Sequence, residues 1–294
     1  MFRESDTPPY KALRPRNASG KLASNMNNRL RLSFYLLACL VPILATTGCT
    51  TVPVTGRHEL NFISSDQEIT LGLSSFDQLK KDTPINHDPS INAVVERVGR
   101  RIAAVAGKDL PNAQWEFVVF ESKEANAFCL PGGKVGVYTG LLPITRDDAG
   151  LATVLGHEIG HAVAHHGASR MSQEEVVQAF GKAVDAGASG TDPKVHSAVL
   201  VAYGLGAKVG VELPYSRAQE SEADHIGLVY MSRAGYDPKQ AVAFWERFSE
   251  FNKAQGGGNI PTLLRDHPVD SARIKQLQGW LPEAQAEFAK ARTQ

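Results

Sequence analysis

The sequence predicts a mainly helical α+β fold with one small antiparallel sheet. Helix starts are indicated at residues 65–68, where Ser and Glu have the spacing of a capping box, and at Asp88, which precedes a proline. Residues 115–120 are apolar and aromatic enough for a strand, and residues 126–142 have the pattern of two strands joined by a Pro-Gly-Gly turn. From Asp147 onward the pattern is helical. With 294 residues, 43% of them hydrophobic, the chain can bury one substantial core.

The first 48 residues have the composition of a targeting segment. A short basic stretch at 26–31 is followed by an apolar run at 32–45 and then by small residues. This order is typical of a secretory signal peptide, which we expect to begin near Met26. The apolar run is short for a membrane span, which needs about 20 residues, and a retained membrane anchor is the alternative.

The pair Gly48-Cys49 resembles a bacterial lipobox, in which the cysteine is acylated and becomes the new N-terminus, although Thr46 stands where an aliphatic residue is usual. Cys39 would then leave with the signal peptide and Cys49 would carry lipid, so that Cys129 has no disulfide partner. We therefore expect a targeting segment at 1–48, a lipid-anchor tether at 49–60 and a single folded domain at 61–294.

The charge balance argues against a nucleic-acid partner. The first 48 residues hold seven basic and two acidic residues, and the rest of the chain holds 24 basic and 29 acidic residues. The body is therefore mildly acidic, whereas nucleic-acid binding needs a basic surface.

Residues 154–167 place four histidines on what reads as a single helix ending at Gly167, and two of them have the spacing of metal ligands. His157 and His161 lie four residues apart, so both imidazoles can converge on one zinc ion from the same helix face. Glu158 lies on the same side as His161 and is placed to act as a general base. The segment therefore has the HExxH pattern of zinc hydrolases.

The other two histidines of this segment, His165 and His166, are predicted to serve in packing or at the helix C-terminus. His165 lies about 12 Å of helix rise beyond His157, too far for one ion with bonds near 2 Å. The longer motif HExxHxxGxxH would need glycine at 164 and histidine at 167, where the chain has Ala164 and Gly167.

Residues 220–224 read ESEAD and offer a third ligand. Glu220 and Asp224 share one helix face, beside the small residues Ala223 and Gly227, which would allow a close approach to the first helix. We assign Glu220 as the metal ligand and Asp224 as the acceptor for a ligand histidine's free N–H. Glu222 points about 200° away and is expected to lie on a solvated face.

Residues 195–213 are mildly apolar. We expect a core helix there and not a membrane span.

These motifs together resemble zinc metallopeptidases of the HtpX, CAAX prenyl protease and BepA-like kind, peptidase family M48. The resemblance runs from about Val52 to Leu281 and includes NAFCLPGGKVGVYTGLL, the HEIGH helix, YSRAQESEAD and RDHPVDSARI. It implies a gluzincin-like zincin fold, one catalytic zinc ion, and a third ligand at the first glutamate of ExxAD, which is Glu220. We expect neither the membrane helices of HtpX nor C-terminal tetratricopeptide repeats, so the resemblance points to a short lipid-anchored branch that clears misfolded envelope proteins.

The expected activity is therefore a zinc endopeptidase acting on unfolded or misfolded polypeptides in the bacterial periplasm, anchored to the outer membrane in preference to the inner one. Glu158 is the expected general base, and His267, with Tyr215 and Arg217 behind it, is the candidate for oxyanion support. A plain loop residue is the alternative for His267.

Two other functions compete with the peptidase. A non-proteolytic lipoprotein, acting as chaperone or scaffold, would have no use for Glu158. A deformylase-type hydrolase would be expected to use an upstream cysteine ligand, for which only Cys129 is available, in the different setting FCLPGG.

The strand at 134–138 is predicted to be a sheet edge beside the zinc that binds substrate main chain. The residues assigned to substrate binding at this edge are Gly133, Lys134, Val135, Gly136 and Val137. Main-chain pairing at an edge would give broad specificity for unfolded chains. A plain core strand is the alternative.

Overall fold

The computed structural model describes residues 49–254 and 261–293, which belong to one compact unit. The predicted targeting segment, residues 1–48, lies outside the described residues. Within the described part, none of the helices combines the length and apolar character needed to cross a bilayer.

The fold is mainly helical with a small sheet, as predicted, but the sheet is mixed. Its strands are β3 (Glu116–Phe120), β4 (Ala127–Leu130) and β5 (Lys134–Tyr138), in the order β3-β5-β4. β5 pairs parallel with β3 and antiparallel with β4. The sequence predicts the hairpin of β4 and β5. It does not predict the parallel pairing of β3 with β5, because no turn signal marks the connection after β3.

The predicted substrate edge at 133–137 is wrong, because β5 is the central strand. Both of its sides are paired, and its residues Lys134 to Val137 are buried. A Cβ atom at Gly136 would lie 2.1 Å from the Phe128 ring, so glycine is needed here to pack β4 against β5. The sheet edge that lies against the HExxH helix is β4.

The predicted tether at 49–60 is a β-hairpin of the folded unit. β1 (Cys49–Thr51) pairs antiparallel with β2 (His58–Leu60). The turn between them uses left-handed backbone at Val54 and Gly56, and Val52 is buried in the main core. The polar, glycine-marked composition that suggested a tether therefore forms a tight turn, while one apolar residue fixes the hairpin to the body.

Two helices precede the sheet and begin at caps close to those predicted. α2 (Ser65–Asp82) begins after Ser64, whose side chain forms the capping box with Gln67, one residue before the predicted pair. α3 (Pro89–Ala106) begins after Asp88, which accepts from the Ser90 amide.

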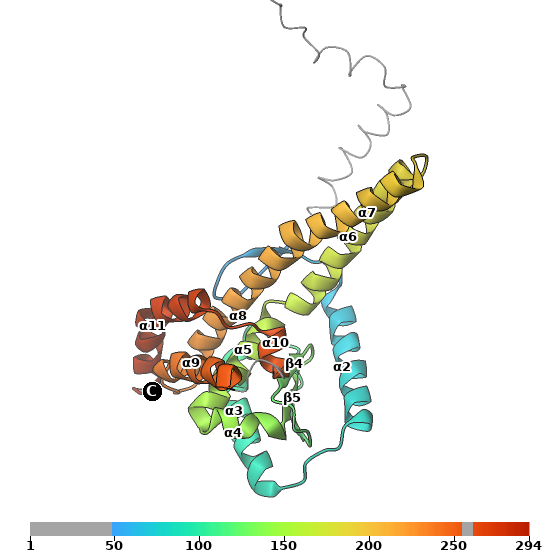
Figure 1. Cartoon of the computed structure of the whole chain (residues 1–294). Coiled ribbons are helices and arrows are strands. Elements are labelled where there is room, and N and C mark those ends of the chain that lie inside the picture. Colours follow the sequence, from blue (N-terminus) through green and yellow to red (C-terminus); the bar gives the residue numbers. More distant parts are fainter. Residues whose placement is uncertain (1–48, 255–260, 294) are drawn as a thin grey trace, which may run out of the picture. The chain divides into compact units, whose positions relative to one another are not determined.

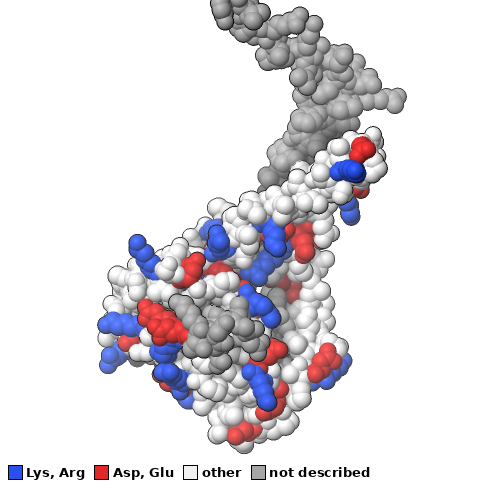
Figure 2. Space-filling view, viewed as in Figure 1, with Lys and Arg blue, Asp and Glu red and all other residues white. Residues whose placement is uncertain are grey.

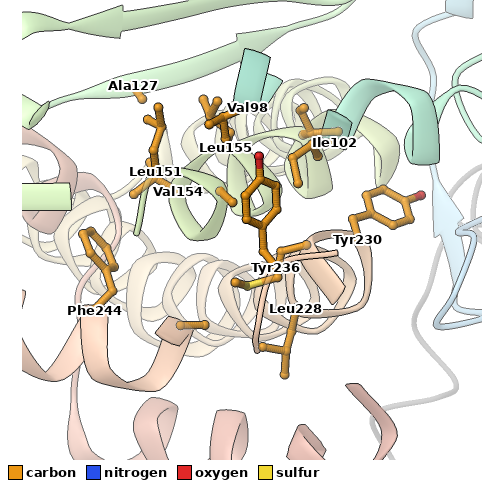
Figure 3. Close-up of a cluster of buried hydrophobic side chains, with 14 of the residues drawn as sticks. Val98, Ile102, Ala127, Leu151, Val154, Leu155, Leu228, Tyr230, Tyr236 and Phe244 are labelled. Atoms are coloured by element: carbon orange, nitrogen blue, oxygen red, sulfur yellow. The ribbon is translucent and has the colours of Figure 1, made fainter. Parts of the chain in front are cut away.

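The core lies where α5 (Asp148–Val163) packs against α8 (Leu213–Arg233), with α3, α9 (Lys239–Ala254) and α11 (Ser271–Ala291) around them. Figure 3 shows apolar side chains converging from several of these elements, among them Val98, Ile102, Leu151, Val154, Leu155, Leu228 and Phe244. Short elements complete the connections: η1 (Thr139–Leu141), α4 (Leu142–Thr145) and α10 (Thr262–Asp266).

The segment that links α5 to α8 is a helical arm (Figure 1). α6 (His166–Ala188) and α7 (Pro193–Ala207) run side by side, and the π-helical turn η2 (Lys208–Glu212) joins α7 to α8. The expectation that residues 195–213 form a core helix is wrong, because α7 has no buried residue. In Figure 2 the arm presents a largely uncharged surface.

Candidate active site

Three predicted metal ligands meet between α5 and α8. The Nε2 atoms of His157 and His161 lie 3.1 Å apart. From α8, Glu220 places Oε2 3.3 Å from His157 Nε2 and Oε1 3.4 Å from His161 Nε2. All three side chains are largely buried, with exposures of 2%, 12% and 7%.

The close approach of the two helices depends on small residues, as the sequence predicts. A Cβ atom at Gly227 would lie 2.7 Å from the His157 backbone nitrogen, and one at Gly160 would lie 2.8 Å from the Ala223 carbonyl oxygen. A larger residue at these positions would push α8 away from α5. Backbone contact between the helices is therefore what brings Glu220 within reach of the two histidines.

His267 completes a group of four donors. It follows α10, and its Nδ1 lies 2.9 Å from Glu220 Oε2 and 3.2 Å from His157 Nε2. One ligand atom from each of His157, His161, Glu220 and His267 lies within 4.8 Å of the others. The structure thus places His267 among the possible ligands, whereas the sequence predicts a catalytic side chain facing the substrate.

Glu158 faces the same centre from α5. Its carboxylate is buried, and Oε1 has no hydrogen-bond partner among the described residues. Nε2 of His267 lies 3.6 Å from this oxygen. Burial raises the pKa of the Glu158 carboxyl, and the neighbouring His267 and His157 act in the opposite direction. A buried carboxylate oxygen left open toward a metal group is placed to exchange a proton there.

The donor set fits zinc. Two or three imidazoles and a carboxylate form a common zinc environment, and zinc bonds of 2.0–2.1 Å imply donor separations of about 3.3 Å in a tetrahedron. The contacts that His157 and Glu220 make within the group measure 2.9–3.4 Å, and the whole group lies within 4.8 Å. Cys129 is not in the group, which leaves a deformylase-type site without its cysteine ligand among the described residues.

Asp224 lies where it was predicted, behind His157. Its Oδ1 is 2.9 Å from His157 Nδ1, which leaves the histidine's Nε2 to face the donor group. Arg273 from α11 binds both oxygens of Asp224, at 2.5 and 2.8 Å, and stacks over Trp245. Sequence reasoning missed Arg273, although it lies in the stretch RDHPVDSARI that carried the resemblance.

Glu222 is buried, and its predicted position on a solvated face is wrong. It is 8% exposed because the turn between β1 and β2 covers that side of α8. Arg57 and Thr55 from this turn donate to its two oxygens, and His166 Nε2 lies 3.0 Å from Oε2. Burial alone would raise the pKa of Glu222, but the hydrogen bonds from His166, Arg57 and Thr55 lower it to about 2.

The four histidines do not share one helix. α5 ends at Val163, His165 has a left-handed backbone with φ 52°, and α6 begins at His166. His165 Nδ1 lies 2.7 Å from Glu68 Oε2, outside the donor group, whereas His166 Nδ1 lies 2.7 Å from His161 Nδ1. The sequence predicts only a packing role for His166, whereas the structure places it in direct contact with the candidate ligand His161. Tyr215, expected behind His267, is hydrogen-bonded to Ser169 of α6.

The helix-borne HExxH pattern, the carboxylate from a second helix and the small sheet define a metallopeptidase class of site. The family model for peptidase family M48 matches residues 89–281. The OMA1 metalloendopeptidase from mitochondria of Schizosaccharomyces pombe is 36% identical over 80% of this chain and 67% of its own length. The corresponding protein of Saccharomyces cerevisiae is 32% identical over 81% and 70%. The β-barrel assembly-enhancing protease of Escherichia coli K12 is 27% identical over 83% of this chain and 51% of its own.

This chain therefore belongs to peptidase family M48, and it is a metalloendopeptidase. The family assignment agrees with the resemblance found in the sequence.

Proposed function

We propose that the protein is a zinc-dependent endopeptidase that cleaves unfolded or misassembled proteins of the bacterial envelope. The observation that carries the proposal is the open, buried oxygen of Glu158 beside the donor group His157, His161 and Glu220. A zinc ion bound by these donors would polarise the scissile carbonyl and lower the pKa of a coordinated water to about 7.

Glu158 would accept the proton of the attacking water and return it to the leaving amine. This general acid–base role is worth roughly 10²–10⁴-fold in rate. The alternative, a chaperone or scaffold without turnover, gives no reason to bury a carboxylate oxygen without a hydrogen-bond partner, which is costly.

His267 would have to move during catalysis. Four protein donors fill a tetrahedral site, and a catalytic zinc needs one open position. His267 follows the short helix α10, and a change in the position of its side chain would free the site without moving α5 or α8. His267 would then be free to support the developing oxyanion, as expected from the sequence.

An extended substrate would pair with β4 in place of β5. Main-chain recognition needs an unpaired edge, and β4 is the edge strand beside α5. Pairing through the backbone would suit unfolded polypeptides of many sequences.

The envelope location rests on residues 26–49 of the sequence and on the name of the Escherichia coli relative, which describes a protease that enhances β-barrel assembly. We propose a lipid anchor at Cys49 on the periplasmic side, at the outer membrane in preference to the inner one. Cys49→Ser should abolish labelling by a palmitate analogue and release the protein from membranes. Persistent attachment of this variant would support a retained signal anchor.

Casein degradation by the full chain tests the proposed activity. Wild-type protein should degrade casein, lose activity with a chelator and regain it with added zinc. Glu158→Gln should keep its zinc and lose cleavage, whereas Glu246→Gln, a change of the same kind at an exposed position of α9, should behave as wild type. A zinc-loaded wild type that binds unfolded protein without cleaving it would favour the scaffold.

A further inference from the structure

The break between α5 and α6 redirects His166 toward the metal group. In an unbroken helix, a residue five positions after His161 would point about 140° away from it. The left-handed backbone of His165 ends α5, and its side chain contacts the buried Glu68 of α2. Non-glycine residues with positive φ are uncommon and cluster at functional sites. Here the consequence is that His166 Nδ1 comes within 2.7 Å of His161 Nδ1.

The contacts of His166 define one consistent arrangement of protons. If His161 presents Nε2 to the metal, its Nδ1 carries the proton and donates to Nδ1 of His166. His166 then carries its own proton on Nε2, which donates to Glu222 Oε2 at 3.0 Å. Both rings are neutral in this arrangement, and each of the two close contacts has one donor and one acceptor.

Glu222 is held in turn by the N-terminal hairpin. Nε of Arg57 donates to Glu222 Oε2 at 2.7 Å, and Nη2 of the same side chain lies 2.6 Å from this oxygen. Thr55 donates to Oε1. The turn that carries Thr55 and Arg57 is closed by hydrogen bonds between Val52 and the residues at 56 and 57, and Val52 is buried.

The two ligand histidines therefore have separate supports. His157 is backed by Asp224 and Arg273, which lie on α8 and α11 in the body of the protein. His161 is backed by His166 and Glu222, and this second path leads out to residues 52–57.

We propose that His166 and Glu222 are positioning residues for the metal ligand His161, and that Arg57 couples the N-terminal hairpin to metal affinity through Glu222. This inference rests on the proposed metal site. Groups that orient a metal ligand from behind typically change metal affinity by about 10–100-fold when they are altered. The segment that follows the proposed lipid-anchor cysteine would thus form part of the support of the metal centre.

Zinc affinity, measured on the full chain by competition with a chromophoric chelator, tests the proposal without using activity. Glu222→Gln keeps the shape of the side chain and removes its charge, and His166→Asn is too short to reach Glu222. We expect each to weaken zinc binding by roughly tenfold or more. Arg57→Gln should cause a smaller, severalfold loss, and Arg57→Lys should restore part of it. The matched control is Arg233→Gln, which removes an ion pair with Glu287 at the far end of α8.

A double-mutant cycle separates coupling from general destabilisation. In the Glu222→Gln background, Arg57→Gln should have little further effect on zinc affinity, because the path to His161 is already interrupted. The absorption bands of the Co²⁺-substituted protein should shift in the Glu222 and His166 variants and stay unchanged in Arg233→Gln.

Equal zinc affinities for wild type, Glu222→Gln and Arg57→Gln would overturn this inference alone. Full additivity of the Arg57 and Glu222 effects would also overturn it, since independent losses would mean no shared path. A wild-type protein that binds no zinc would overturn the proposed function itself, and this result is read from the wild type before any variant is compared.

Discussion

Helices α7 and α8 follow one another along the chain, and their burial is the reverse of what their compositions suggest. α8 contains the charged residues of ESEAD and has 12 of its 21 residues buried, including Glu220, Glu222 and Asp224. α7 is rich in valine, alanine and leucine and has none of its 15 residues buried. Val201 and Leu205 of α7 are 60% and 61% exposed.

The difference shows that partners decide burial here more than polarity does. Each buried carboxylate of α8 has polar partners: Glu220 faces histidines, Glu222 binds His166 and Arg57, and Asp224 binds Arg273. Buried charges are tolerated when they are paired or coordinate a metal. The apolar residues of α7 have no such counterpart in the described body, since this helix packs mainly against α6 of the same arm.

The largest effect is expected from removing a buried charge of α8. Glu220→Gln replaces one of the four candidate ligands, and the only one from α8, so zinc affinity should fall by more than about 100-fold, beyond the range of groups that only orient a ligand. Casein cleavage should be lost with the metal. Metal content after dialysis checks this, with the exposed-site variant Glu246→Gln as control. A Glu220→Gln protein that keeps its zinc would mean that α8 supplies no ligand.

The second-largest effect is expected from truncating a leucine, which should lower stability much more in α8 than in α7. Leu228 of α8 is 2% exposed, so Leu228→Ala should lower the free energy of unfolding by about 2–5 kcal/mol. Leu205→Ala removes the same atoms from an exposed site of α7 and should change it by no more than about 0.5 kcal/mol. Denaturant melts of both variants give the comparison. A large loss for Leu205→Ala would show that α7 is covered in solution, and the contrast would then fail.

The smallest effects, of opposite sign, are expected from glycine-to-alanine changes. At Gly227 of α8 the new Cβ would meet the backbone of Gly156 and His157 at 2.7–2.8 Å, so Gly227→Ala should destabilise by about 1–3 kcal/mol. At Gly204 of α7 nothing lies within 4 Å, and Gly204→Ala should stabilise by up to about 1 kcal/mol through helix propensity. Thermal melts distinguish the signs. Two changes of the same sign would remove the backbone contact as the explanation.

Sequence reasoning identified those parts of the site whose residues lie close together on one helix. His157, Glu158 and His161 follow from spacing on a single helix, and Glu220 with Asp224 follows from a second helix marked by small neighbours. The structure brings His157, His161, Glu220 and Asp224 into direct contact, and Glu158 lies beside His267 of the same group. Their roles in binding metal and in catalysis stay predictions that the variants above address.

The errors arose where distant segments decide the outcome. β5 is central because β3 pairs with it in parallel, and no local pattern announces that partner. Glu222 is buried because the turn at 52–57 covers it, which a helical wheel of α8 cannot include. The left-handed residue His165 sits in a run that reads as continuous helix. In each case, the outcome depends on contacts with segments that are distant in the sequence.

The arm formed by α6 and α7 also offers a place where extra residues can be inserted into this chain. Gly156 and Gly227 touch through their backbones although the whole arm separates them in sequence. Its tip, residues 189–192, is exposed and far along the helices from the junctions with α5 and α8. Extra residues at an exposed tip cost little in loop-closure entropy and leave both junctions in place. The tip is therefore a suitable insertion point for an epitope or a fluorescent reporter, which would leave the packing of α5 on α8 intact.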